Sequence, residues 1–176
     1  MHAADLVIDV TEVDTSATAP LGQLYFEPAT SQASVTTVKP PANSGPRTWV
    51  YVFNDDTAIL VAGRIVMRDA LSTNYDGLLT TAGTLIPTIR LLGVAQHDIA
   101  VGSYGWILKQ GVGEVMAGNG AVIGADTALT SAGTTTAGTA LDFAAGTTAP
   151  GCIFAFSTEA STGTNGLATC RIDCRG

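Results

Sequence analysis

The chain has 176 residues, a formal net charge of −7, and 46% hydrophobic but only 13% charged residues. Nucleic-acid binding needs a concentrated basic surface, so this charge balance argues against a nucleic-acid-binding protein. With only two Lys and four Glu, the chain also lacks the residues that normally cover helical surfaces, which argues against a helical protein. The all-β fold is predicted from the strand pattern described below.

Length and hydropathy favour a domain whose surface is partly covered. The mean hydropathy is +0.31, and a chain of this length can bury a sizeable core. Apolar surface with so little charge suggests that partners cover part of the exterior; an ordinary Thr-rich β-protein is the alternative. The sequence contains no run of about 18 apolar residues, so no transmembrane helix is expected. Residues 1–5 lack the basic start of a cleaved signal peptide, so none is expected.

Residues 1–46 differ from the rest, and we expect them to form an extended N-terminal interaction arm. Residues 5–10 and 22–26 are the stretches apolar enough to form strands, whereas prolines in the arm remove backbone donors and favour irregular structure. An arm that cannot bury a core alone is expected to lie along this domain or a neighbour; a disordered tail is the alternative. Its interface candidates are Leu6, Ile8, Leu24, Tyr25 and Phe26.

Residues 47–176 are expected to form one compact β-domain, a barrel or a sandwich, because short apolar runs alternate with Gly-rich turns. The expected strands cover residues 49–53, 58–66, 88–95, 104–110, 114–117, 141–144, 153–157 and 167–172. Residues 68–78 are the expected place for a short helical turn. Gly118-Asn119-Gly120 is a hairpin-type turn signal, and Asp76-Gly77 and Asn165-Gly166 are expected in loops.

A weak internal repeat predicts two similar halves. Residues 80–84 recur as residues 135–139, a spacing of 55, and Trp49 has a counterpart in Trp106, a spacing of 57. Two half-barrels of about 55 residues would then pair to bury a shared core. The alternative is chance similarity in a chain rich in Thr, Ala and Gly.

Groups for catalysis or cofactor binding are scarce, and no enzyme is expected. His97-Asp98 is the only adjacent His–acid pair, and neighbours in a strand or loop point in different directions. Residues 102–105 are similar to a nucleophile elbow, but Val101 occupies the first glycine position and no helical pattern follows. Residues 118–124 lack the helix that a dinucleotide-binding loop needs, so they are interpreted as turns. No catalytic residue and no cofactor is therefore assigned.

Metal ligation and disulfides are not expected either. Cys170 and Cys174 lie four residues apart in an expected strand, roughly 13 Å, which is too far for a disulfide. Buried reduced thiols are expected, and a bridge from Cys152 to one of the other two is the alternative. The acids considered for calcium match no loop motif and are interpreted as solvated turn residues. These acids are Asp55, Asp56, Asp69 and Asp76.

The C-terminal strand carries alternating charges. Arg171, Asp173 and Arg175 share one face of a strand. Arginine suits interface ion pairs because of its planar, multiply donating guanidinium. Arg171 and Arg175 are therefore candidates for salt bridges between subunits, with an exposed terminal strand as the equal alternative.

The second half of the chain resembles a known family. Residues 92–95, 98–100 and 102–107, the Ala/Thr/Gly-rich segment 118–139 and residues 153–155 resemble the capsid decoration (cement) proteins of tailed bacteriophages. The resemblance covers about residues 47–174. It implies a compact β-barrel or β-tulip domain that forms homotrimers on the outer capsid surface of the virion and ties major capsid proteins together. It implies no catalytic residue. The charge, the hydropathy and the motifs above predict no cofactor, no nucleic-acid contact and no membrane contact.

Two other roles remain open. One is a virion surface or fibre domain that binds host glycans, which requires that Trp49, Trp106 and Tyr104 are exposed. The other is a different virion subunit, such as a tail-tube or head-completion protein, for which sixfold ring symmetry is expected.

Overall fold

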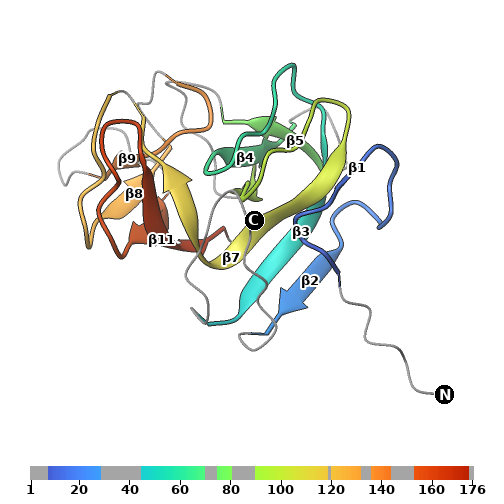
Figure 1. Ribbon diagram of the computed structural model, residues 1–176, viewed down its shortest axis with the longest axis horizontal. Helices are drawn as coiled ribbons and strands as arrows, with labels where there is room; N and C mark the ends of the chain where they lie inside the picture. The colour runs from blue at the N-terminus through green and yellow to red at the C-terminus, as the bar shows by residue number, and fades with distance from the viewer. Residues whose placement is uncertain are drawn as a thin grey trace.

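The computed structural model describes residues 8–28, 45–69, 75–80, 90–118, 120–131, 136–143 and 153–174, and the structural statements below concern these residues. They form an all-β protein without an α-helix, as expected (Figure 1). Within them, no helix has the length and apolar character needed to cross a membrane. The strands are β1 (Val13–Asp14), β2 (Leu24–Glu27), β3 (Arg47–Asn54), β4 (Ile65–Arg68), β5 (Asp76–Leu79), β6 (Leu91–Val94), β7 (Tyr104–Met116), β8 (Ala128–Thr130), β9 (Leu141–Asp142), β10 (Ile153–Ser157) and β11 (Leu167–Asp173).

Five strands close into a barrel, which we call the first ring. Its order is β3-β5-β4-β6-β7, and the pairing of β3 with the N-terminal half of β7 closes it. All neighbours are antiparallel except β3 and β5. Apolar side chains fill its interior because strand residues alternate between the two faces. The buried cluster there consists of Val50, Val52, Leu60, Val66, Leu79, Leu92, Ala95, Ile99 and Ile107.

The C-terminal half of β7 begins a second ring, in the order β7-β11-β10-β8-β9. A parallel bridge between Ala117 and Ala140 returns from β9 to β7 and closes it. Figure 1 shows β7 running from one lobe of the molecule into the other. The strand turns at Gly111, whose φ is 123°. A Cβ there would lie 2.9 Å from the Pro46 carbonyl oxygen, so only glycine fits this close approach without strain.

The two rings have the same strand order and the same register. Val66 pairs with Leu79 in the first ring, and Leu129 pairs with Asp142 in the second, each residue 63 positions later (66 to 129, 79 to 142). The closing parallel pairs obey the same shift: Asn54 with Gly77, and Ala117 with Ala140. Two similar halves are therefore present.

Backbone irregularities repeat as well. The register shift of β4 against β6, opposite Leu91 and Gly93, recurs between Ile153 and Ala155 of β10, here 62 positions later. Positive φ values occur at equivalent positions of the two rings, 63 residues apart. One such pair is Gly63 (83°) and Asp126 (57°), and the other is Gly102 (73°) and Asn165 (54°).

The expected spacing of 55 to 57 residues, and the pairing of half-barrels, are wrong. Each half closes its own ring, and Trp106 is not the counterpart of Trp49. It lies opposite Tyr51 in the first ring, and the residue equivalent to Trp49 is Val112. In the Thr-rich pair of segments, residues 81–84 and 135 lie outside the described residues.

Gln96 fastens the junction between the rings. Its fully buried side-chain amide donates to the Glu114 carbonyl (3.1 Å) and its side-chain oxygen accepts from the Glu114 N–H (2.9 Å), so it acts as a strand partner for β7. Gln96→Ala leaves both backbone groups without these bonds. We expect a loss of about 1–3 kcal/mol in the free energy of unfolding, measured with guanidinium chloride. Gln110→Ala, at an exposed side chain of β7, is the matched control and is expected to change stability by less than ~0.5 kcal/mol. Equal effects of the two variants would contradict this role of Gln96.

Residues 8–28, which we call the strap, lie along the first ring. β1 pairs with β7, and β2 pairs with β3 in the register Leu24 to Val50 through Glu27 to Arg47. The strand expected at 22–26 is thus confirmed as β2. The strand expected at 5–10 is not formed at residues 8–10, which lie outside any strand, and residues 5–7 lie outside the described residues.

Several other expected elements are corrected. The helical turn expected at 68–78 is wrong at its described ends, because β4 includes Arg68 and β5 begins at Asp76. Gly77 is thus in a strand rather than in the expected loop. At this position in the strand, a Cβ atom would lie 2.9 Å from Val66 Cγ1. The expected strand 58–66 is reduced to a bridge of Leu60 with Ile99 and the start of β4.

The hairpin expected after β7 is also wrong. The strands expected at 104–110 and 114–117 are one continuous strand. A turn does form, with the Ala121 N–H donating to the Gly118 carbonyl. However, β7 pairs with the distant β11 instead of β8, the next strand along the chain.

Two of the cysteines are buried, as expected. The Cys170 thiol donates to the Ala168 carbonyl (3.3 Å), and burial raises its pKa to about 12. Cys174 is also buried, and Cys152 lies outside the described residues. A thiol with so high a pKa is inert near neutral pH because the reactive thiolate is scarce.

Candidate interaction surface

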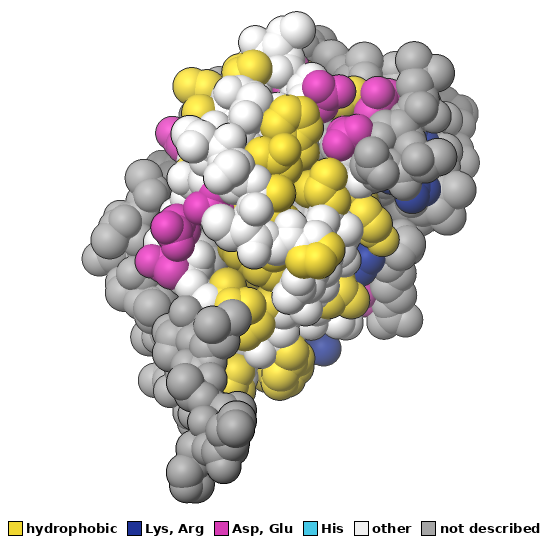
Figure 2. All heavy atoms as spheres, turned by 90° about the vertical axis from the view of Figure 1, so that its right-hand side faces the viewer, with side chains coloured by type: hydrophobic (Ala, Val, Ile, Leu, Met, Phe, Trp, Pro, Cys, Tyr) yellow, Lys and Arg dark blue, Asp and Glu magenta, His cyan; other side chains and the backbone are white. Residues whose placement is uncertain are grey.

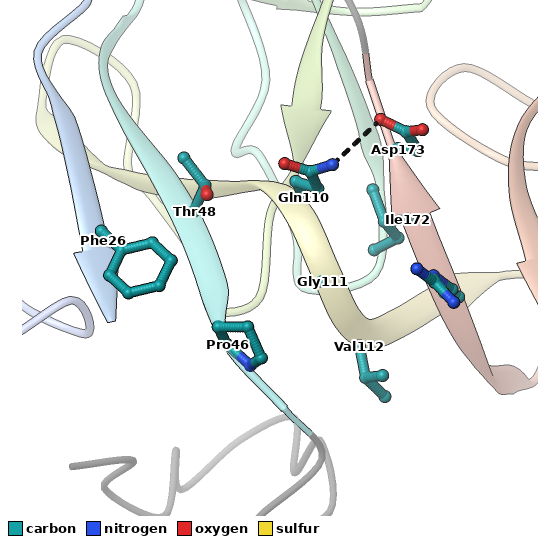
Figure 3. Close-up of a pocket in the computed structure, with 9 residues that line it drawn as sticks. Phe26, Pro46, Thr48, Gln110, Gly111, Val112, Ile172 and Asp173 are labelled. Carbon is teal, nitrogen blue, oxygen red and sulfur yellow. Dashed lines mark hydrogen bonds between the residues drawn. The ribbon is translucent and has the colours of Figure 1, made fainter. Parts of the chain in front are cut away.

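A groove opens where β7 turns from the first ring into the second. It measures about 430 Å³ and lies between β2, β3, β7 and β11 (Figure 3). Its lining residues are Phe26, Pro46, Thr48, Gln110, Gly111, Val112, Arg171, Ile172 and Asp173. The structure thus brings together two interface candidates that are far apart in the sequence, Phe26 of the arm and Arg171 of the C-terminal strand.

Strand register makes the groove part of a continuous surface. Phe26 lies opposite Thr48, Thr48 opposite Gln110, and Gln110 opposite Asp173. The Gln110 amide donates to Asp173 Oδ1 at 3.5 Å (Figure 3). Residues on one side of neighbouring strands form a shared face, so four strands contribute to this surface.

Two hydrophobic side chains of β2 are exposed to solvent on this surface. Leu24 and Phe26 are 57% and 62% exposed, and their spacing of two places them on the same face of the strand. β2 ends the strand order, and among the described residues no strand pairs with its other side. An edge strand with exposed apolar side chains is a template for pairing with another chain.

A buried ion pair holds the opposite face of β2. Glu27 and Arg47 are cross-strand neighbours, nearly inaccessible to solvent, and joined at 3.5 Å. The Trp49 indole also donates to Glu27 Oε2 at 2.9 Å. Burial lowers the pKa of Arg47, while the charge of Glu27 opposes this shift. One face of β2 is thus held by this ion pair, while the other face carries the exposed side chains of Leu24 and Phe26.

The second ring presents another exposed patch next to the groove. Arg171 of β11 lies between Val112 of β7 and Phe156 of β10 in the register. Phe156 is 56% exposed and Arg171 is exposed. Among the described residues Arg171 forms no salt bridge, although Glu114 lies diagonally across from it on β7 and Asp173 lies two positions along β11. We call Val112, Glu114, Phe156, Thr169 and Arg171 the outer face of the second ring.

The strap carries a second hollow, of about 340 Å³, with a different character. Its lining includes the carboxylates of Asp9, Glu12 and Asp14 beside the apolar Ile8 and Trp106. We call these three carboxylates the acidic hollow. Figure 2 views this side of the molecule, where hydrophobic side chains form a central band and acidic side chains lie at its margins.

Hydrogen bonds from residues that line the acidic hollow hold the strap in place. Asp14 Oδ2 accepts from the Tyr51 hydroxyl (3.0 Å) and from Thr18 Oγ1 (2.6 Å). Hydrogen bonds from Thr11 lower the pKa of Asp9, which keeps its carboxylate charged. Within the described part of the chain, no group of three or more His, Cys, Asp or Glu residues could hold a metal ion.

The other sequence candidates take different positions. Tyr25 lies on the face of β2 opposite to Leu24 and Phe26. Its ring contacts the Trp106 ring edge-on, with centroids 6.0 Å apart. Ile8 is half-buried against the core, and Leu6 and Arg175 lie outside the described residues.

The acids considered for calcium take different positions. Asp56 lies in the bend after β3 and accepts hydrogen bonds from the Leu79 and Ala58 N–H groups, in agreement with its interpretation as a turn residue. That interpretation is wrong for Asp76, which begins strand β5.

Comparisons with known proteins bear on the fold. No family model matches the sequence, and no curated protein matches it significantly. Among solved structures, the chain is similar to the head fiber gp8.5 N base of bacteriophage phi29, with 18% sequence identity and a TM-score of 0.50. The match covers 72% of this chain and 95% of that one. At this identity the two proteins share a fold, and the chain is therefore structurally similar to the base of a phage head fibre.

Proposed function

We propose that this chain is a structural protein of a bacteriophage head, without catalytic activity, that binds the outer capsid surface as an oligomer and stabilises the shell. Its proposed partners are the major capsid protein and further copies of itself, in a trimer, on the outside of the virion. The observation that carries the proposal is the fold shared with the phage head-fibre base. The resemblance of residues 47–174 to capsid decoration proteins agrees with it.

The open edge of β2 supports a docking role. An added strand from the shell would gain main-chain hydrogen bonds along β2, while Leu24 and Phe26 would lose their exposure to water. A capsid offers many identical sites, so an oligomer can engage several at once. Linked contacts of this kind raise the overall affinity far above that of each single contact.

The burial of the tryptophans argues against the glycan-binding alternative. Trp49 is fully buried and Trp106 is 4% exposed, while Tyr104 is half-buried and stacks on Tyr51. The two indole rings are therefore not available for stacking on a sugar.

Co-sedimentation with expanded capsids of the encoding phage tests the proposal. We expect the wild-type chain to migrate with the capsids. Leu24→Asp is expected to reduce the bound amount at least tenfold, because a charge at this position opposes burial of the β2 edge. Val101→Asp, at a residue 51% exposed in the loop before β7, is the matched control and should bind like wild type. Failure of the wild-type chain to migrate with capsids would overturn the proposal, and a sixfold ring would favour a tail-tube or head-completion role.

A further inference from the structure

His97 is a buried polar side chain without a polar contact. It is nearly inaccessible to solvent, and neither of its ring nitrogens has a hydrogen-bond partner among the described residues. Burial of a polar group without a partner costs free energy, because the group has lost its bonds to water. Any local opening that lets water reach the imidazole therefore relieves this cost.

The strap meets the first ring at the position of His97. β6 pairs with β7 through Val94 and Leu108. In the same register His97 would lie opposite Gly105, but the chain bends away from β7 and Val13 of β1 pairs with Gly105 instead (Figure 1). A Cβ built on Gly105 would lie 3.4 Å from His97 Nε2, so the imidazole stays close to this residue. β1 of the strap and His97 thus meet at the same residue of β7.

The first part of the strap is held less firmly than the second. Residues 8–19, which we call the flap, pair with β7 through the two residues of β1, and Asp14 accepts a hydrogen bond from the Tyr51 hydroxyl. The second part, β2, pairs with β3 through four residues and includes the buried ion pair of Glu27 and Arg47. Segments with short ladders and few buried contacts are the ones that open locally.

A turn separates the flap from β2. The Gln23 N–H donates to the Pro20 carbonyl (3.0 Å), and Gly22 has a φ of 80°. A few residues between two elements are enough to absorb the backbone rotation of a hinge. The flap can therefore leave the first ring while β2 keeps its place on β3.

The charges around His97 determine how acid acts on the flap. Asp98, on the same bend, and Asp9, on the flap, favour a protonated imidazole, and from β7 the uncharged Gly105 faces it. Burial outweighs both carboxylates and lowers the pKa of His97 from 6.5 to about 4. An open flap admits water, so the open form binds the proton at a higher pH than the closed form. Closure of the flap therefore weakens as the pH falls from 6.5 to about 4.

We propose that the flap opens on acidification, and that the buried, unpartnered imidazole of His97 drives this opening. Opening uncovers Trp106, which lines the acidic hollow beside Ile8 and Asp9 of the flap. β2 stays in place, and with it the exposed edge that the proposed function uses. The flap is thus a pH-sensitive device of the fold that goes beyond the proposed function and does not depend on it.

Amide hydrogen exchange of the purified full chain tests the flap between pH 7.5 and pH 4.5, with rates corrected for the intrinsic effect of pH. We expect the protection of residues 8–19 to fall by at least about tenfold over this range. At pH 4.5 it should also lie at least about tenfold below that of β11, because β11 stays folded when the flap opens. In His97→Gln, which takes up no proton in this range, the flap should lose less than about twofold in protection.

Two further variants separate the role of His97 from other effects. His97→Leu removes both unpartnered nitrogens, so its flap should be more protected than that of the wild type even at pH 7.5. Glu12→Gln removes an exposed carboxylate of the flap and is the matched control, which should keep the pH dependence of the wild type. Far-UV circular dichroism at pH 4.5 checks that each variant is folded.

Three results would overturn the proposed flap. They are equal protection of residues 8–19 and β11 at every pH, a protection of the flap that does not change with pH, and an unchanged acid response in both His97 variants. None of them bears on capsid binding, which co-sedimentation tests separately.

Discussion

Replacement of Glu27 by Ala is expected to lower the free energy of unfolding by about 3–5 kcal/mol, the range typical when one member of a buried ion pair is removed. The variant takes away the carboxylate 3.5 Å from the Arg47 guanidinium and the acceptor of the Trp49 indole. Both groups are buried, so water does not readily replace the lost bonds. The measurement is denaturant unfolding at neutral pH.

A second variant separates the ion pair from the packing of the strap. In Glu27→Leu combined with Arg47→Met, no charge remains in the buried site, and stability is expected to return to within about 1–2 kcal/mol of wild type. Glu12→Ala, at an exposed acid of the strap, is the control for loss of a carboxylate. A loss below ~1 kcal/mol for Glu27→Ala would show that the pair does not hold β2 in place.

Acidification is expected to destabilise the protein through His97. This side chain is 4% exposed, and neither ring nitrogen has a hydrogen-bond partner among the described residues. Burial lowers its pKa from 6.5 to about 4, although the charges of Asp98 and Asp9 act in the opposite direction. The folded state therefore holds the imidazole neutral where the unfolded chain already binds a proton.

The sign of the pH effect follows from proton binding. Between pH 6.5 and about 4 the unfolded state binds more protons at His97, so stability falls as the pH falls through this window. The full shift corresponds to about 3 kcal/mol, since each pKa unit is worth ~1.4 kcal/mol. Below pH 4 the folded state also binds the proton and this contribution stops growing.

Comparison with His97→Gln isolates this contribution from the titration of carboxylates. Unfolding free energies of both proteins are measured from pH 7.5 to pH 4. The wild-type curve is expected to fall by about 3 kcal/mol more than that of the variant. Parallel curves for the two proteins would contradict a depressed pKa of His97.

Local sequence patterns determined the class of the protein and many of its strands. The alternation from Trp49 to Phe53 and the apolar runs at 153–157 and 167–172 correspond to β3, β10 and β11. Such patterns are informative because side chains of a strand alternate between the two faces of a sheet. The strand expected at residues 22–26 corresponds to β2.

Only the tertiary structure decided which strands meet. The groove joins Phe26 to Arg171 because β3 and β7 bring β2 and β11 to one surface, and no local pattern encodes that pairing. The repeat of 63 residues was likewise hidden from the sequence. Backbone hydrogen bonds and turns preserve it, whereas equivalent side chains such as Trp49 and Val112 differ in size, because one is covered by the strap and the other lies partly open to solvent.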